Sequence, residues 1–203
     1  MRFAFHHFAT NQFFYRVPAH FRQFHRFSDA NCTNFIRGEL VGNYLLCPAV
    51  LGNQPDWKSS SPSMIAEFTL KVPGWVSVAG RSAFLPTGLF GASEKHLFDH
   101  ADREHPIYFS FPFQRVDDVT VELPVGWQIM NMPASQKRDG HVVTYSSEAG
   151  NNEGSLQLHR VLNVDIMLMD VKYYATLRNF FQAVRTADEQ QVMLQPSSAS
   201  ASN

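Results

Sequence analysis

The sequence predicts a mainly β fold: an antiparallel β-sandwich-like domain with one C-terminal α-helix, preceded by a poorly ordered N-terminal extension. Three observations lead to this prediction. Short segments that alternate apolar and polar residues recur after residue 63, and turn residues separate them. One segment near the C-terminus repeats its apolar residues at helical spacing instead. The first thirty residues show neither pattern, so we do not expect them to form part of the core.

The composition limits the kinds of protein that this chain can be. It has 203 residues, of which 44% are hydrophobic and 13% aromatic, enough to form a core. Its 17 basic and 18 acidic residues give a formal net charge of -1, which provides no general attraction to nucleic acids or anionic membranes. No apolar run approaches the roughly 20 residues of a membrane span. We therefore expect one ordered domain, with no nucleic-acid partner and no membrane span.

Residues 1–52 form an atypical extension. Eight of the eighteen Phe lie in the first thirty residues with four His and four Arg, and no Leu or Ile precedes Ile36. A core normally mixes aliphatic with aromatic residues, because branched side chains fill the gaps between rings. We interpret the extension as disordered or non-native sequence. Two alternatives are an arm that stacks on single-stranded nucleic acid and a targeting peptide, although the apolar run of a secretory signal is missing.

The β-rich domain is predicted to cover residues 64–195. The preceding residues, 53–63, are rich in Gly, Pro, Ser and Asn, which indicates a linker. Residues 196–203 have the composition of a flexible tail. Alternation and turn pairs predict strands at Ala66–Val72, Trp75–Ala79, Ile107–Phe113, Val116–Leu123, Trp127–Met130, His141–Ser146, Ser155–Val164 and Gln191–Leu194.

Two of these strands are expected to form a hairpin. His141–Ser146 and Ser155–Val164 flank the loop EAGNNEG, whose Asn and Gly residues tolerate positive φ. In Val116–Leu123 the valines alternate with polar residues, so one face is expected to be buried. We expect large aromatic residues to build the core of the sheet, namely Trp75, Phe109, Phe111, Phe113 and Trp127.

The predicted helix covers Lys172–Ala187. Its apolar residues form a stripe at helical spacing, and polar residues occupy the opposite face. Such a stripe is typical of a core contact, so we expect it to cover the sheet. The stripe consists of Tyr173, Tyr174, Leu177, Phe180, Phe181 and Val184.

A cluster of ionisable residues lies between Glu94 and His105. His96 and His100 are four residues apart, so on a helix they would share one face, and imidazoles with a carboxylate suit zinc. The order HExxH is absent, and Pro106 would end such a helix early. Polar residues of a connector also cap turns. We therefore favour a structural connector, and a metal site at His96, His100 and His105 is the alternative.

Nucleophilic catalysis has little support in the sequence. Cys32 and Cys47 stand in no recognisable catalytic context, and a buried or incidental thiol explains each of them. Asp117 and Asp118 are neighbours in a predicted strand, so their side chains should point to opposite faces and not act as a pair. Phosphate-binding glycine motifs are also absent. We predict no catalytic residue, no cofactor-binding residue and no cofactor.

Residues from about Asp56 to Pro196 resemble the C-terminal region of bacterial transglutaminase-like proteins of the DUF3857 type. The similar pieces are DWKSSSPSMIAEFTLKVPGW, LPTGLF, EKHLFDHADREHPIYFSFPF, DDVTVELPVGW and LNVDIMLMDVKYYATLRNFFQAVRTADEQQVML. The resemblance covers roughly two thirds of the chain, and the run from LPTGLF to ELPVGW is its most distinctive part.

The resemblance implies a role and a setting. Proteins of this type look like three modules: an N-terminal β domain, a papain-like core with a Cys-His-Asp triad, and a C-terminal β-rich domain. Only the last module is matched, and no such triad is recognisable, so no catalytic residue is carried over. We expect a non-catalytic accessory or interaction domain, a truncated gene product whose partner is a transglutaminase-like core or another protein domain. The resemblance also implies an exported or periplasmic parent protein.

Overall fold

The computed structural model describes residues 12–19, 49–51, 64–71, 76–88, 97–152 and 154–197. Within these residues the fold is mainly β with one α-helix, as predicted, and every strand pairs antiparallel with its neighbours. No helix in this part of the chain is long and apolar enough to cross a membrane.

The largest sheet has four strands in the order β7-β11-β10-β9. Two of its strands, β10 and β11, form a long hairpin, and β7 lies along the other side of β11 over ten residue pairs. The bounds of the four strands are Phe113–Glu122 for β7, Ser155–Val164 for β11, Val143–Asn152 for β10 and Gln136–Asp139 for β9.

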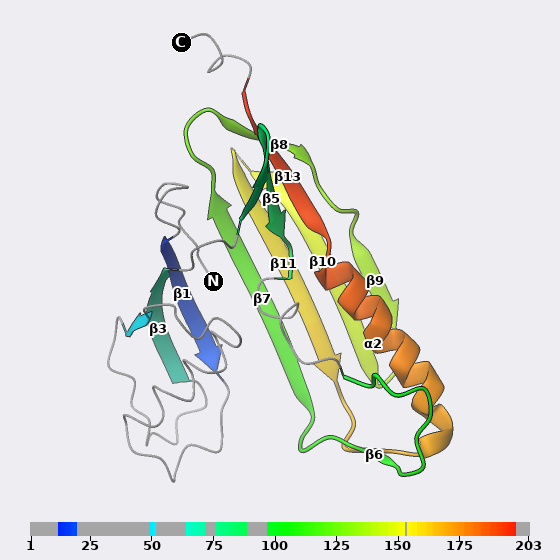
Figure 1. Ribbon diagram of the computed structural model, residues 1–203. Coiled ribbons are helices and arrows are strands. Elements are labelled where there is room, and N and C mark those ends of the chain that lie inside the picture. The colour runs from blue at the N-terminus through cyan, green and yellow to red at the C-terminus, as the bar shows by residue number, and fades with distance from the viewer. Residues whose placement is uncertain are drawn as a thin grey trace.

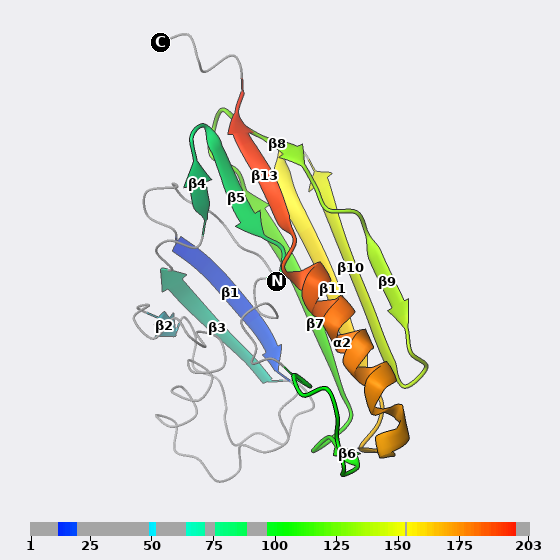
Figure 2. The same ribbon diagram turned by 45° about the vertical axis from the view of Figure 1, so that its right-hand side comes forward.

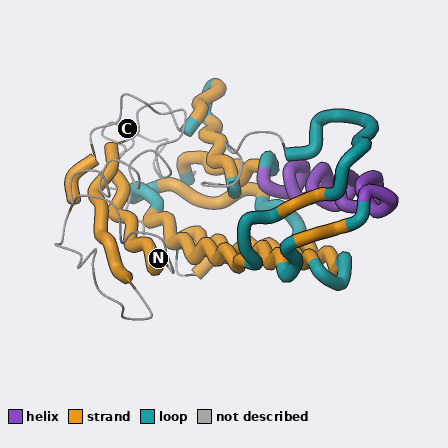
Figure 3. Tube along the Cα trace, turned by 90° about the horizontal axis from the view of Figure 1, so that it is seen from below, coloured by secondary structure: helices purple, strands orange, loops and turns teal. Residues whose placement is uncertain are grey.

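A second layer covers one face of this large sheet. It consists of helix α2, Tyr174–Asp188, followed by strand β13, which is part of a smaller sheet in the order β4-β5-β13-β8. The ribbon views show α2 along one half of the large sheet and β13 continuing over the other half (Figures 1 and 2). From below, the helix lies to one side of the long strands (Figure 3). The smaller strands are β4 at Ser77–Ala79, β5 at Ser82–Pro86, β13 at Gln191–Pro196 and β8 at Trp127–Asn131.

The described residues also form two smaller sheets. Strands β6, Ile107–Tyr108, and β12, Leu168–Met169, pair next to the start of the helix, where the 3-10 helix η2 spans Val171–Tyr173. Strands β1, β3 and β2 form a three-stranded sheet in the order β1-β3-β2. Their bounds are Gln12–Ala19 for β1, Met64–Lys71 for β3 and Ala49–Leu51 for β2.

The core lies between the two layers. Under the helix it contains residues of β10, β11, β6 and α2, which are Ile107, Val143, Tyr145, Leu162, Val164, Tyr174, Leu177, Phe181, Val184 and Ala187. The other buried apolar residues belong to β5, β13, β7 and β11, and they are Ala83, Leu85, Val192, Leu194, Val119, Val121, Leu156 and Leu158. In β5, β10, β11 and β13 the buried residues alternate along the strand, so burial follows the period of two that the sequence displays.

Several sequence predictions are confirmed by these elements. The strand in Val116–Leu123 and the final strand lie where alternation places them, and the helix differs from its predicted bounds by one or two residues. The predicted hairpin is present, but β10 continues to Asn152 through most of the predicted loop EAGNNEG, and Gly154 is the only described residue of that loop with a positive φ. Most of the helical stripe is buried, but Tyr173 lies in η2 with about half of its surface exposed.

Other predictions need correction. Ile107–Phe113 is not one strand: β6 ends at Tyr108 and β7 begins at Phe113. The predicted aromatic core is wrong for Phe111, which is exposed in the connection between them, and Trp127 is only half-buried. Phe109 and Phe113 pack at the margin of a mainly aliphatic core, and Trp75 lies outside the described residues. The physical reason is that Phe111 sits beside Pro112, which cannot donate to a strand ladder.

The N-terminal extension is described only in part. Two of its segments form strands, β1 and β2, and both pair with β3, although the sequence predicts no regular structure for 12–19. The rest of residues 1–52, the linker 53–63 and most of the tail lie outside the described residues. The domain boundaries therefore remain predictions.

Candidate functional site

The interior contains a cluster of charged and polar side chains at the C-terminal end of α2. Arg160 of β11 and Asp188, the last residue of α2, are 7% and 3% exposed, and Tyr145 of β10 is equally buried. Asp117 of β7 stands opposite Arg160 in the strand register. Because all three strand residues occupy inward positions, the sheet itself brings them together beneath the helix end.

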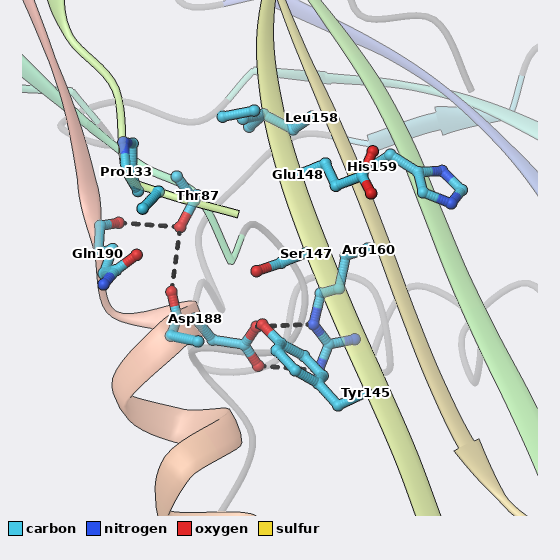
Figure 4. Close-up of a pocket in the computed structure, with 13 residues that line it drawn as sticks. Thr87, Pro133, Tyr145, Ser147, Glu148, Leu158, His159, Arg160, Asp188 and Gln190 are labelled. Carbon is cyan, nitrogen blue, oxygen red and sulfur yellow. Dashed lines mark hydrogen bonds and ion pairs between the residues drawn. The ribbon is translucent and has the colours of Figure 1, made fainter. Parts of the chain in front are cut away.

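Arg160 connects the members of this cluster. Its Nε and Nη2 atoms donate to the two carboxylate oxygens of Asp188 at 2.7 and 2.8 Å, and its Nη1 donates to Oδ2 of Asp117 at 3.2 Å. The Tyr145 hydroxyl donates to Oδ1 of Asp188 at 2.7 Å, and the guanidinium carbon lies 5.4 Å from the centre of the Tyr145 ring. The bidentate pair and the nearby phenol are seen in Figure 4.

The electrostatics of the cluster follow from burial and from its unequal numbers of charges. Burial raises the pKa of Asp117, and the positive charge of Arg160 only partly opposes this effect. Burial and the negative charge of Asp188 raise the pKa of the Tyr145 phenol, so it remains a hydrogen-bond donor. Burial lowers the pKa of Arg160, but its hydrogen bonds to Asp188 and the negative charges of Asp188 and Asp117 together outweigh burial and raise the pKa. Two carboxylates thus share one guanidinium. Its contact with Asp188 is the stronger one, because it is bidentate and its hydrogen bonds are shorter.

A short segment after β5 closes the same helix end. The amide of Gly88 donates to the carbonyl of Asp188 at 3.0 Å, and the amide of Thr87 donates to the carbonyl of Gln190 at 2.9 Å. A Cβ atom at Gly88 would lie 2.6 Å from the carbonyl oxygen of Asp188, so only glycine allows this approach. This contact holds the backbone of Asp188 in place, and Arg160 holds its carboxylate.

A small hollow adjoins the cluster. Its volume is about 20 Å³, which has room for a water molecule but not for a substrate. It is lined by Thr87, Pro133, Ala134, Tyr145, Ser147, Glu148, Ala149, Leu158, His159, Arg160, Ala187, Asp188 and Gln190. The cluster can therefore hold the helix against the sheet, and its own hydrogen bonds occupy its charged atoms.

The histidine-rich connector lies only partly within the described residues. His100 and His105 have exposed side chains, and their backbone carbonyls accept hydrogen bonds from the Tyr174 hydroxyl at 2.7 Å and from Nε of Arg103 at 3.0 Å. Among the described residues, no group of three or more His, Cys, Asp or Glu could hold a metal ion. His96 and Glu94 lie outside those residues, so the three-histidine alternative remains a prediction.

Phe98 attaches this connector to α2. Its ring lies 6.0 Å from that of Tyr174 and 5.2 Å from that of Phe181, and its carbonyl accepts a hydrogen bond from Arg178 at 3.2 Å. Its φ of 64° is unusual for a bulky residue. The surrounding contacts hold it in this conformation, so the described part of the connector, residues 97–106, serves as a strap across the helix.

The family match covers the same elements. Residues 81–194 match DUF3858, a domain of unknown function with a solved structure. The chain belongs to the DUF3858 family. The matched range runs from the residue before β5 into β13, so it includes both layers and the buried cluster. The family shown therefore differs from the DUF3857 type that the sequence suggests.

A candidate protease from Parabacteroides distasonis, known from a crystal structure, is similar to 47% of this chain with 9% identity and a TM-score of 0.42. This DUF3858 chain spans 19% of the length of that structure. Comparison with curated proteins gives no match.

Sequence reasoning missed the buried cluster of the DUF3858 domain. The signal was present at Arg160, which interrupts the inward apolar series of β11 between Leu158 and Leu162. An arginine in an inward register position requires a buried partner. Asp188 follows the apolar stripe of α2 and gives a weaker signal, because an acid at a helix C-terminus opposes the helix dipole unless a cation pairs with it.

The paired acids Asp117 and Asp118 lie as predicted on opposite faces of β7. Asp117 joins the buried cluster, whereas Asp118 contacts Nδ1 of His159 on the exposed face of the sheet. Cys32 and Cys47, the two thiols considered above, lie outside the described residues.

Proposed function

We propose that this chain is a non-catalytic C-terminal accessory domain of a transglutaminase-like protein, which packs on or positions the catalytic core. One observation carries the proposal: among the described residues, the buried charged groups bond to one another around Arg160, and the hollow beside them has room for about one water molecule. The sequence resemblance to the last module of such proteins supports the choice of partner. An accessory domain of this kind acts by binding.

Activity measurements test this proposal. The purified chain is assayed for amine incorporation into a glutamine-containing protein and for proteolysis, beside the variant Cys47→Ala and the matched variant Cys32→Ala. We expect no turnover from any of the three proteins. Turnover by the wild-type chain that is lost in one cysteine variant and kept in the other would identify a nucleophile and overturn the proposal.

A metal-binding or hydrolytic function is the second candidate, and the exposure of His100 and His105 on one connector favours it. Together with His96, these side chains would supply imidazole ligands suited to zinc. Mass spectrometry of the metal content of purified wild-type chain and of His100→Ala tests this function. Stoichiometric zinc that is lost in the variant would support it, and metal-free wild-type chain after zinc loading would rule it out.

A further inference from the structure

Large exposed apolar side chains gather on two connecting segments at one end of the domain. Of the ten that the described residues expose, six belong to residues 97–112 and 165–173. Strands β6 and β12 join these segments, and both ribbon views place β6 near the beginning of α2 (Figures 1 and 2). We name five of these residues the end surface: Tyr108, Phe111, Met167, Leu168 and Tyr173.

The pairing of β6 with β12 directs the side chains of Tyr108 and Leu168, the centre of the end surface, toward solvent. Tyr108 and Leu168 are direct register partners, so their side chains leave the same face of the two-stranded sheet, and they are 65% and 64% exposed. Their neighbours Ile107 and Met169 point the other way and pack in or against the core. Because the inward residues are anchored, the outward pair cannot turn into the core without breaking the register.

The same two segments have an excess of acidic residues. They contain five acids, Asp99, Asp102, Glu104, Asp165 and Asp170, but only two bases, Arg103 and Lys172, which gives a formal charge of -3 with His neutral. Both bases, and the acid Asp170, are engaged locally. Arg103 donates to the carbonyl of His105 and lies 5.9 Å from the ring centre of Tyr174, and Lys172 lies 3.6 Å from Asp170.

From these observations we infer that the end surface is a docking site for a different protein whose own surface has an apolar centre and a basic rim. The acidic excess of the two segments favours this partner over a second copy of the chain, because two such surfaces would repel one another across a symmetric interface. This inference rests on the proposed function and takes the transglutaminase-like core as the partner.

Calorimetric titration tests the inference. The probe is the core domain of a transglutaminase-like protein, prepared without its C-terminal module. It is titrated with the wild-type chain and with the double variant Tyr108→Ser, Leu168→Ser. The matched control is Val125→Ser, Met130→Ser, which removes two exposed apolar side chains of β8 and the turn before it. Circular dichroism verifies that each variant is folded.

We expect the wild type and the control to bind alike, the end-surface variant to bind at least roughly tenfold more weakly, and affinity to fall as salt is added. Binding that survives unchanged in the end-surface variant overturns the docking site and leaves the proposed function standing. No binding by any folded protein overturns both. A wild-type dimer that the end-surface variant abolishes, measured by light scattering, overturns the choice of partner in favour of a second copy.

Discussion

Arg160 is the residue on which the buried charges of this domain depend. It is the cation between two inward carboxylates, and its bidentate bond to Asp188 ties the end of α2 to the middle of the large sheet. Removing one partner from a buried ion pair leaves the other charge without compensation, which destabilises a protein far more than losing an exposed pair.

The first prediction concerns this pair. Asp188→Asn should lower the free energy of unfolding by about 3 kcal/mol, because the buried guanidinium loses its charged partner. The control Asp118→Asn removes a carboxylate that contacts His159 on the exposed face, and it should change stability by no more than about 1 kcal/mol. Urea unfolding of both variants measures the two values. Equal losses would show that burial does not govern the strength of this pair.

Asp117 leads to a pH prediction. Burial raises its pKa above the usual 3.8, so the folded state binds this proton more tightly than the unfolded state does. Its contribution to stability therefore falls as the pH rises from about 3.8 through the raised pKa. The variant Asp117→Asn cannot ionise, so its stability relative to wild type should increase over this window. Urea unfolding of both proteins from pH 4 to pH 8 tests the sign, and a relative stability that decreases with pH would contradict it.

Gly88 is predicted to be intolerant of a side chain. In Gly88→Ala the new methyl group would meet the backbone of Asp188, so the segment after β5 must shift, and we expect a loss of about 2 kcal/mol. Gly150 of β10 has open space around it and serves as the control. Thermal unfolding of Gly88→Ala and Gly150→Ala measures the loss of stability in each variant. A loss at Gly150 as large as that at Gly88 would mean that crowding is not the cause.

At the scale of elements, Phe98 provides the aromatic packing of the strap on α2. Phe98 holds the connector against Tyr174 and Phe181, so Phe98→Ala should destabilise the domain by about 2 kcal/mol and speed amide exchange in residues 97–106. Phe111→Ala is the control, because that side chain is exposed outside the core. Hydrogen exchange read by mass spectrometry locates the change. Faster exchange spread evenly over the whole domain would contradict a local strap.

The elements also show where sequence information was sufficient. The hairpin β10–β11 and helix α2 could be predicted because each buries one face, which imposes a period of two or of 3.6 on the residues. Strand β9, QKRD, could not be predicted because it contains no apolar residue. It is an edge strand that pairs with the backbone of β10. Strand β5 was missed because it is short and contains small residues, although Ala83 and Leu85 are fully buried in the completed sheet.

At the scale of the whole molecule, the sequence located the connector but could not reveal the site. The sequence favours a connector over a metal site there, and the structure exposes the side chains of His100 and His105 while their backbone carbonyls accept hydrogen bonds. The buried cluster joins residues from β7, β10, β11 and the end of α2, which only the sheet register and the helix position bring together. Arg160 at an inward position is a local signal of a buried cluster, but the identity of its partners leaves no local pattern.

Our account of the whole molecule is that buried charges hold the fold while the domain acts by binding. The most direct test replaces the cluster as a unit with Tyr145→Phe, Arg160→Met, Asp188→Leu and Asp117→Asn, so that none of its charges remains unpaired. A folded variant of this kind should bind the transglutaminase-like core with the same affinity as wild type, within roughly threefold, in a calorimetric titration. A folded variant that no longer binds the core would contradict the account, because the cluster would then take part in function.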